Sequence, residues 1–600
     1  EFESLFPHQV VFMRHNNLIE LFFDKFKNAN KNEILLSSLN PKNAISLSWL
    51  ETEKYIFKLS KLIKSIINKG DRCLLLSENR PEWFISDMAI MQSGGITVPT
   101  YTTYTASDYE YILNDCKPSI IIVSGKKLFE KINILVSKNE FIKKVIYFDN
   151  DNYFENEKKI IKISSLSNMV LNNEDRQICQ DIKRSSPACI IYTSGTGGNP
   201  KGVMLSHGGI LSNVDGADEL LKPIIKERPT FLTWLPLSHS YEHTVQFVQI
   251  NVSAKIVYAE SIDKLLKNIS EAKPDIMTAV PRFYQNLYNK INLNFKSQKG
   301  FKKELINKTI NLGTKKLLQK KFTFVEKLQN FLCENLVRKK IRKQFGGRLK
   351  AFVSGGGALD KEIGEFLNAI GLPTLQGYGL TEASPVVSCN PIHKIKIDTV
   401  GPPLKGNLIK ISEDGEILVK GENIMLGYWG KIKETNDVIK NGWLYTGDIG
   451  EITKDDGYLK ITDRKKDIIV NAGGDNISPS RIEAKLDIAP EIAQSMLYGD
   501  YKNYLVAIIV PNKEEALIWA KENNKSEDLS ILIKDENFIK IIKQVTERVN
   551  KNLSVIEQVR KFILIDHEFT IENGMMTPSM KVRRFKVKEK YEESLENLYS

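Results

Sequence analysis

The chain carries, directly after the apolar run 188–191, a string rich in glycine and hydroxyl side chains: Tyr192-Thr-Ser-Gly-Thr-Gly-Gly-Asn-Pro-Lys-Gly202. Its glycines allow successive backbone N–H groups to point at one anion, and its lysine adds a positive charge. It is not a Walker A loop, because that loop has a glycine directly before its lysine and a Ser or Thr directly after it, and this string has neither. Glycine clusters also form ordinary turns, so composition alone leaves a phosphate site and a plain turn both open.

Six further strings with similar chemical potential follow along the chain: Trp234-Leu-Pro-Leu-Ser-His239, Ser354-Gly-Gly-Gly-Ala358, Gln376-Gly-Tyr-Gly-Leu-Thr-Glu382, Tyr445-Thr-Gly-Asp448, Asp463-Arg464 and Thr577-Pro-Ser-Met-Lys581. Taken singly, an acid or a lysine is usually a solvated surface group. In this order, from about residue 50 to residue 590, the strings resemble the AMP-forming adenylate-forming superfamily. Its members are acyl- and aryl-CoA synthetases, peptide-synthetase adenylation domains and beetle luciferases. The chain departs from the usual pattern at Gly197 and Ser579, where Thr is commoner.

The resemblance implies a nucleotide site. Asp448 would accept hydrogen bonds from the vicinal ribose diol, and a turn-forming role after Gly447 is the alternative. Tyr378 stands between two glycines, so its ring can lie flat against adenine unless it is simply a core tyrosine. Arg464 would reach ribose or phosphate. The other residues implied to contact ATP or AMP are Thr193, Ser194, Gly195, Thr196, Gly197, Gly198, Lys201, Gly355, Gly356, Gly357, Gln376, Gly377, Gly379 and Thr381.

The resemblance also implies three catalytic residues. Attack of a fatty carboxylate on the α-phosphate of ATP brings two anions together, so cations must reduce their repulsion. Lys581 would contact both the carboxylate and the α-phosphate, and His239 would lie beside the acyl carboxylate. Glu382 and the hydroxyl of Thr196 would hold Mg²⁺, which prefers hard oxygen ligands.

A second reaction step follows from the same resemblance. In this superfamily a small, mobile C-terminal domain rotates after adenylation and withdraws the catalytic lysine. Lys466 falls at the hinge position, and Gly473 and Gly474 fall where the backbone must approach the pantetheine arm of CoA closely. The thiol of CoA then attacks acyl-AMP and releases AMP.

Three strings favour a long-chain fatty acid as the substrate: 235–243, 280–284 and 459–466 look like long-chain acyl-CoA synthetases. The expected ligands are therefore a long-chain fatty acid, ATP, Mg²⁺ and CoA. His243 is open between a role at the mouth of an acyl tunnel and a structural role in the core. Transfer to acyl carrier protein is the main alternative, because its phosphopantetheine arm is chemically the same as that of CoA. A non-catalytic, membrane-associated acyl or nucleotide sensor is disfavoured, since Glu382, Asp448 and Lys581 are all present.

The elements that must position these residues read as an α/β protein. Short apolar runs alternate with helix-length segments over 71–123 and again after residue 187, which predicts a large N-terminal domain of parallel α/β sheets. The glycine-rich segment 399–450 predicts a small β-barrel-like or antiparallel unit. An α+β pattern follows residue 463, so we expect an adenylation domain over 1–462 and a smaller, mobile lid domain with the lysine over 463–600.

The composition is consistent with a globular, cytoplasmic protein that binds anions. The 600 residues include 85 Lys and Arg against 73 Asp and Glu, a formal net charge of +12. This charge suits phosphates, a membrane surface or nucleic acid, but no motif for nucleic acid accompanies it. No apolar run approaches the ~20 residues of a membrane span, and no signal peptide is visible. Dense lysines over 290–350 predict either a solvated helical face or peripheral contact with anionic lipid.

Overall fold

The alternation expected over 71–123 is present in the computed structural model, which describes residues 15–149, 159–193, 200–577 and 581–600. The segment forms β3 (Arg72–Leu76), α3 (Pro81–Gln92), β4 (Ile96–Thr100), α4 (Ala106–Cys116) and β5 (Ile120–Val123). Strand β3 pairs in parallel with both β4 and β5. Parallel neighbours joined by helices confirm the predicted α/β class.

The first large sheet has the strand order β18-β9-β8-β4-β3-β5-β6-β7. Strands β8 and β9 pair antiparallel, so they form a hairpin at the chain segment that carries the glycine-rich string. Helices α4, α5 and α6 cover one face of this sheet. The elements not yet bounded are β6 (Lys144–Tyr147), β7 (Ile160–Lys162), β8 (Pro187–Thr193), β9 (Lys201–Ser206), β18 (Gly427–Tyr428), α5 (Lys126–Phe129) and α6 (Asn133–Lys138).

The second large sheet has the order β15-β14-β13-β12-β10-β11-β1-β2, and only its edge strands β15 and β2 run antiparallel. Because β13 and β14 are parallel neighbours, the strings that follow them meet at one edge of the sheet. The strands are β1 (Ile34–Ser38), β2 (Ser46–Ser48), β10 (Thr230–Thr233), β11 (Lys255–Tyr258), β12 (Ile276–Ala279), β13 (Ala351–Ser354), β14 (Thr374–Gly379) and β15 (Val386–Cys389).

Helices α3 and α8 (Ser240–Asn251) are buried on almost all sides, because they share one hydrophobic core with side chains of both sheets. Helix α8 is polar for such a place, and several of its polar side chains each make a hydrogen bond inside the core. Glu242 accepts a hydrogen bond from the Thr278 hydroxyl at 2.7 Å, and burial raises the pKa of Glu242 to about 8. His243 Nε2 lies 2.8 Å from Asp87 Oδ2, with both residues fully enclosed. His243 is therefore a structural residue.

The remaining helices of this core and of the outer face of the second sheet have the following bounds: α1 (Leu18–Asn28), α2 (Trp49–Lys64), α7 (His207–Leu221), α8 (Ser240–Asn251), α9 (Leu265–Ala272), α10 (Pro281–Lys296), α13 (Lys339–Gln344) and α14 (Lys361–Ala369). Helices α9, α10, α13 and α14 contribute to a separate apolar cluster on that outer face. The cluster gives the second sheet a helical layer on its far side.

The glycine-rich segment forms a small antiparallel sheet with the order β16-β17-β20-β19, and β21 pairs with β20. The antiparallel alternative, rather than a closed barrel, therefore describes this unit. Its elements are β16 (Leu408–Ile411), β17 (Glu416–Lys420), α15 (Ile432–Val438), β19 (Ile439–Lys440), β20 (Trp443–Ile452) and β21 (Leu459–Arg464).

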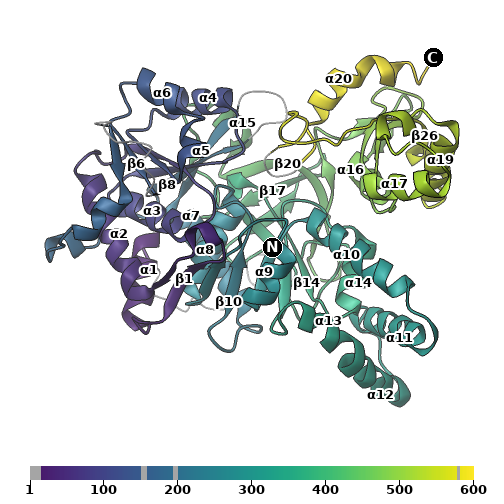
Figure 1. Ribbon diagram of the computed structural model, residues 1–600, viewed down its shortest axis with the longest axis horizontal. Coiled ribbons are helices and arrows are strands. Elements are labelled where there is room, and N and C mark those ends of the chain that lie inside the picture. Colours follow the sequence, from purple (N-terminus) through teal and green to yellow (C-terminus); the bar gives the residue numbers. More distant parts are fainter. Residues whose placement is uncertain (1–14, 150–158, 194–199, 578–580) are drawn as a thin grey trace.

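The C-terminal part has its own α+β core, set apart at the upper right of Figure 1. A three-stranded sheet of the order β24-β25-β26 packs against helices. Its elements are β22 (Ile469–Val470), β23 (Asn476–Ile477), α16 (Pro479–Asp487), β24 (Ile492–Tyr498), β25 (Leu505–Pro511), α17 (Lys513–Glu522), α18 (Leu529–Leu532), α19 (Glu536–Asn550), β26 (Val559–Leu564) and α20 (Arg584–Glu596).

The basic segment 290–350 is helical, as predicted, and projects at the lower right of Figure 1. It comprises the end of α10, then α11 (Gly300–Leu317), α12 (Phe324–Cys333), a π-helical turn (Glu334–Arg338) and α13. No helix in the described part of the chain combines the length and the apolar character that crossing a bilayer requires.

Strand β14 approaches β15 so closely at Gly379 that a Cβ there would lie 2.0 Å from the Pro385 carbonyl oxygen. We expect Gly379→Ala to lower the free energy of unfolding by about 3 kcal/mol, because backbone atoms cannot move aside as a side chain does. Urea unfolding measures this. Gly357→Ala is the control, since its Cβ would lie 3.4 Å from Pro281, an ordinary contact. Equal stability of the two variants would contradict the prediction.

Candidate active site

The glycine-rich string begins at the end of β8 and finishes at the start of β9. Thr193 pairs with Lys201, and the Thr193 hydroxyl lies 3.5 Å from the Lys201 carbonyl oxygen. The predicted phosphate-binding residues Ser194, Gly195, Thr196, Gly197 and Gly198 lie outside the described residues. The structure thus brings Thr193 and Lys201, from either end of the string, next to each other.

Glu382 follows β14 and lies beside this hairpin. Its Oε1 accepts a hydrogen bond from the Tyr428 hydroxyl at 2.9 Å, and the Lys201 ammonium lies 4.8 Å from the centre of the Tyr428 ring. Tyr428 therefore connects the predicted phosphate lysine to the predicted metal-binding acid. One step earlier in the chain, the Thr381 hydroxyl lies 3.1 Å from the hydroxyl of Ser240, the first residue of α8.

A buried carboxylate joins two of the other strings. Asp448 Oδ2 accepts a hydrogen bond from the Tyr378 hydroxyl at 2.6 Å, and Asp448 Oδ1 lies 3.2 Å from Arg464 Nε. Asp448 and Arg464 are direct partners across β20 and β21, which fixes this ion pair. A carboxylate oxygen accepts more than one hydrogen bond, so Asp448 retains capacity for hydroxyl donors.

The glycine turn after β13 lies at the same edge of the sheet as Tyr378. Gly356 has a φ of +81°, and a Cβ on Gly355 would lie 2.9 Å from the Tyr241 ring. The turn therefore requires glycine for its conformation and for its approach to α8. Gln376 is buried beside it with Oε1 unpartnered, and Gly377 passes close to β15. These residues form the wall at which a flat ring could lie.

His239 caps the N-terminus of α8 through Nδ1, which accepts the Tyr241 N–H at 3.1 Å. Enclosure by protein atoms and the nearby Lys581 ammonium lower the pKa of His239 to about 4. At neutral pH this imidazole is uncharged. Because Nδ1 accepts the Tyr241 N–H, the proton of the neutral ring lies on Nε2, which can donate one hydrogen bond, but the uncharged ring cannot neutralise an anion.

Lys581 comes from the C-terminal part and reaches the same site. Its backbone is held by Thr577, whose N–H donates to the Lys581 carbonyl at 2.8 Å and whose hydroxyl accepts the Lys581 N–H at 3.1 Å. The side chain keeps contact with solvent. Desolvation by the surrounding protein and repulsion by Arg464 nevertheless lower its pKa to about 8, while the carboxylates of Asp448 and Glu382 act in the opposite direction.

The pKa of Lys581 predicts a pH dependence. A lysine carries its charge below its pKa, so any rate that needs the ammonium is full below about pH 8 and falls above it. We expect kcat/KM for pyrophosphate exchange with ATP to decline above pH 8, and the decline in kcat to lie higher, because bound phosphates favour the charged form. A profile flat to pH 10 in both parameters would contradict a catalytic ammonium at this position.

Three predicted residues lie away from this cluster of contacts. Lys466 is exposed in the turn that follows β21. Gly473 and Gly474 form the exposed tip of the β22–β23 hairpin, where Gly474 has a φ of +85°. The neighbouring Ala472 N–H donates to the Lys502 carbonyl, within the C-terminal part. In this arrangement Lys581, and not Gly473 or Gly474, belongs with Glu382 and Asp448, because their carboxylates act on its pKa.

Sequence reasoning missed Tyr428. It stands in Leu426-Gly-Tyr-Trp429, a string without acids or cations, and β18 brings it to the hairpin by pairing with β9. An aromatic residue next to a glycine was the only available signal, and it is a weak one.

The assembled side chains offer a ring-sized wall, a diol acceptor, an acid and an ammonium, which together complement a nucleotide and a second anion.

Comparison with known proteins agrees with this geometry. Residues 23–429 match the AMP-binding enzyme family, and residues 466–600 match the C-terminal domain of AMP-binding enzymes. The long-chain-fatty-acid–CoA ligase FadD15 of Mycobacterium tuberculosis is 30% identical over 542 residues, or 90% of each chain. Long chain acyl-CoA synthetase 3 of Arabidopsis thaliana is 29% identical and covers 92% of this chain and 86% of that protein.

Solved structures agree on the fold. The adenylation domain of a carboxylate reductase from Mycobacterium chelonae superposes with a TM-score of 0.74 at 20% identity, covering 97% of this chain and 91% of that one. The anthranilate CoA ligase AuaEII, in complex with anthranoyl-AMP, gives 0.72 at 18% identity, covering 97% and 98%. The resemblance first drawn from the motifs is confirmed: the chain belongs to the AMP-binding enzyme family.

Proposed function

We propose that this chain activates a long-chain fatty acid with ATP to acyl-AMP and then transfers the acyl group to CoA. The observation that carries the proposal is the convergence of Lys581, from the C-terminal part, with Glu382 and Asp448. Relatives whose names are long-chain fatty acid–CoA ligases support the choice of acid and acceptor. AMP and pyrophosphate are the other products.

In the first step a carboxylate oxygen forms a bond to the α-phosphorus of ATP, and the bond to the pyrophosphate oxygen breaks. The Lys581 ammonium lowers the repulsion between carboxylate and phosphate. Tyr378 and the glycine turn would hold the adenine, and Asp448 the ribose diol. His239, uncharged, orients the carboxylate without adding charge.

Mg²⁺ fits the acid at this site. The hydrogen bond from Tyr428 occupies Glu382 Oε1 and orients the carboxylate, leaving Oε2 for a hard cation. Glu382 and the hydroxyl of Thr196 would hold the ion together with phosphate oxygens. When bound, Mg²⁺ neutralises charge on the phosphates.

We propose a division into an adenylation domain, 1–462, and a lid domain, 463–600, that turns about Lys466. Rotation would remove Lys581 from the site after the first step and bring Gly473 and Gly474 to the pantetheine arm. The observed φ of +85° at Gly474 and the exposure of this tip suit a backbone that a thiol arm must pass closely. The thiol sulfur then bonds to the acyl carbon, the bond from that carbon to the phosphate oxygen breaks, and AMP leaves while the thiol proton passes to solvent.

The proposed function is tested by pyrophosphate release with palmitate or oleate, with and without CoA. We expect slow release without CoA and sustained turnover to acyl-CoA and AMP with it. Turnover with holo-acyl carrier protein instead of CoA would move the acceptor to the carrier protein. Nucleotide binding without pyrophosphate release would contradict catalysis and favour the sensor.

We also propose that the enzyme contacts anionic membranes peripherally. A long-chain fatty acid partitions into bilayers, so a surface-bound enzyme meets its substrate at high local concentration. The basic segment 290–350 is the part of the chain with the composition for such contact.

A further inference from the structure

Helix α12 is amphipathic in the reverse of the usual sense. Its apolar side chains point outward, with Phe324 at 85% and Phe331 at 64% exposed. The exposed residues recur at helical spacing along α12 and into the following turn, and we call them the outer face: Phe324, Val325, Leu328, Phe331, Leu332 and Leu336. A surface helix normally turns such a stripe toward the core. Exposed apolar side chains that gather on one face in this way are typical of an interaction site.

Polar contacts on the opposite side fix this orientation. Glu326 pairs with Lys315 of α11 at 2.6 Å, and Asn330 accepts a hydrogen bond from Arg338 at 2.8 Å. Cys333, on the same side, is buried. Rotating the helix to hide its outer face would break these contacts and expose Cys333. The polar contacts and the burial of Cys333 therefore keep the apolar side chains of α12 turned outward.

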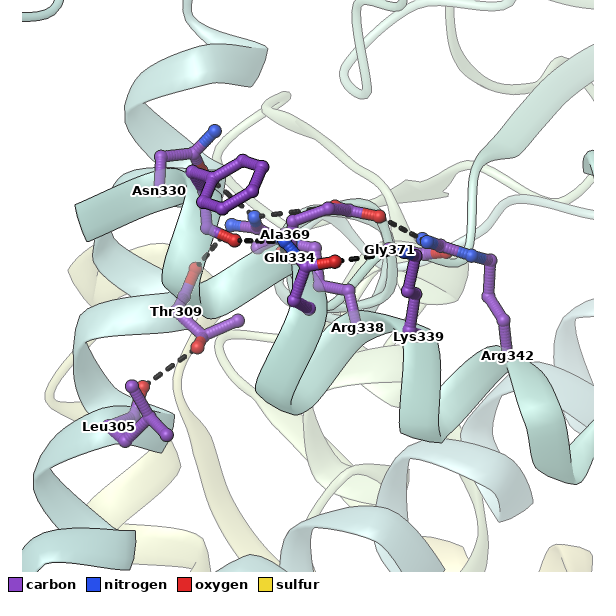
Figure 2. A network of polar contacts seen from close by, with 11 residues as sticks. Leu305, Thr309, Asn330, Glu334, Arg338, Lys339, Arg342, Ala369 and Gly371 are labelled. Carbon is purple, nitrogen blue, oxygen red and sulfur yellow. Dashed lines mark hydrogen bonds and ion pairs between the residues drawn. The ribbon is translucent and has the colours of Figure 1, made fainter. Parts of the chain in front are cut away.

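Arg338 lies at the centre of a network of polar contacts at the base of α12, as Figure 2 shows. This buried guanidinium donates to the carbonyls of Ala369 and Thr309, at 2.8 and 3.0 Å, besides its bond to Asn330. Glu334 pairs with Arg342 and lies 3.7 Å from Arg338. The guanidinium thus ties α11, α12 and the end of α14 together, so α12 projects on a rigid base.

The surroundings of the outer face are strongly basic. Residues 315–343 contain ten Lys and Arg against two acids, and both acids are engaged inside the unit. Lys320, Lys321 and Lys327 are exposed beside the apolar side chains. Apolar side chains flanked by exposed lysines complement the boundary between anionic headgroups and acyl chains. Two copies of the same positive face would repel each other, which disfavours a symmetric dimer here.

We propose that the outer face of α12 is the surface that docks this protein on an anionic bilayer, with its phenylalanines below the headgroups and its lysines among them. The inference rests on the proposed function, because a fatty acid dissolved in that bilayer is the substrate. It adds to the peripheral contact a defined face, an orientation and the side chains that bind.

Vesicle flotation of the full chain tests the proposal, using phosphatidylcholine vesicles with and without about one third phosphatidylglycerol. Phe324→Ser with Phe331→Ser should lower the partition coefficient about tenfold or more, because two apolar side chains leave the interface. The control pair Val170→Ser and Ile432→Ser, equally exposed at 81% and 78% but elsewhere, should change it less than twofold. Binding should also weaken without phosphatidylglycerol.

Equal flotation of wild type and the Phe324/Phe331 pair would overturn the proposal. So would light scattering that finds a wild-type dimer which this pair converts to a monomer without loss of flotation, since a second copy would then be the occupant. Pyrophosphate release from ATP with palmitate supplied on serum albumin, in the absence of vesicles, keeps the two questions apart. We expect the pair to retain that activity, whereas its absence in the wild type would contradict the proposed function and leave the flotation result standing.

Discussion

Replacing Lys581 by Ala should abolish adenylation and spare the second step. We expect the rate of pyrophosphate exchange to fall about 10³-fold, because a cation aimed at two converging anions is lost from the site. Thioester formation from supplied acyl-AMP should stay within a few-fold of wild type. In acyl-AMP the carboxylate charge is already gone, so this step does not bring a carboxylate and a phosphate together. The two rates are measured separately on the same preparation.

A second lysine controls for charge and folding. Lys586 lies in α20 of the same C-terminal part, exposed and paired with Glu589 at 2.8 Å. Lys586→Ala should leave both rates within twofold. If Lys581→Ala slowed both steps equally, the lysine would act on the fold or on binding of both substrates. If it slowed neither, the lysine would have no part in catalysis.

Glu382→Gln should produce the second largest loss, about 10² to 10³-fold in adenylation. The amide keeps an oxygen to accept the Tyr428 hydroxyl but removes the negative charge. The loss should therefore come with a requirement for much higher Mg²⁺, which a titration of the rate with Mg²⁺ measures. Unaltered Mg²⁺ dependence would contradict the proposed metal-binding role.

Tyr428→Phe separates orientation from charge at this acid. It removes the hydrogen bond to Glu382 and keeps the ring beside Lys201. We expect a loss of about tenfold or less with the Mg²⁺ requirement slightly raised, because one neutral donor to a carboxylate contributes about 1.5 kcal/mol. A loss equal to that of Glu382→Gln would make Tyr428, rather than the acid's charge, the dominant element.

The sequence was most informative where local pattern fixes structure. Alternating apolar runs placed β3, β4 and β5 because parallel strands buried on both faces read as short apolar segments. The motif strings identified Tyr378 and Asp448 as candidates for the same nucleotide site, although the two residues are far apart in the chain. Their direct hydrogen bond depends on how the small antiparallel sheet packs on β14, and no local pattern encodes that packing.

Long-range partners explain most of what sequence reasoning could not predict. His243 was open between two roles until the fold brought Asp87 within 2.8 Å of it. The basic segment 290–350 was recognised by its lysines, yet the apolar face of α12 went unnoticed. Which side of that helix faces the solvent is decided by Arg338 and by Lys315 of a different helix. Amphipathic spacing alone predicts the opposite orientation.

A crystal structure of the protein with ATP and Mg²⁺ gives the most direct test of the site. It should show the adenine against Tyr378, the ribose hydroxyls on Asp448, the metal ion on Glu382, and the α-phosphate within reach of the Lys581 ammonium. A triphosphate bound elsewhere, with Lys581 and Glu382 both far from it, would contradict the assignment of this site.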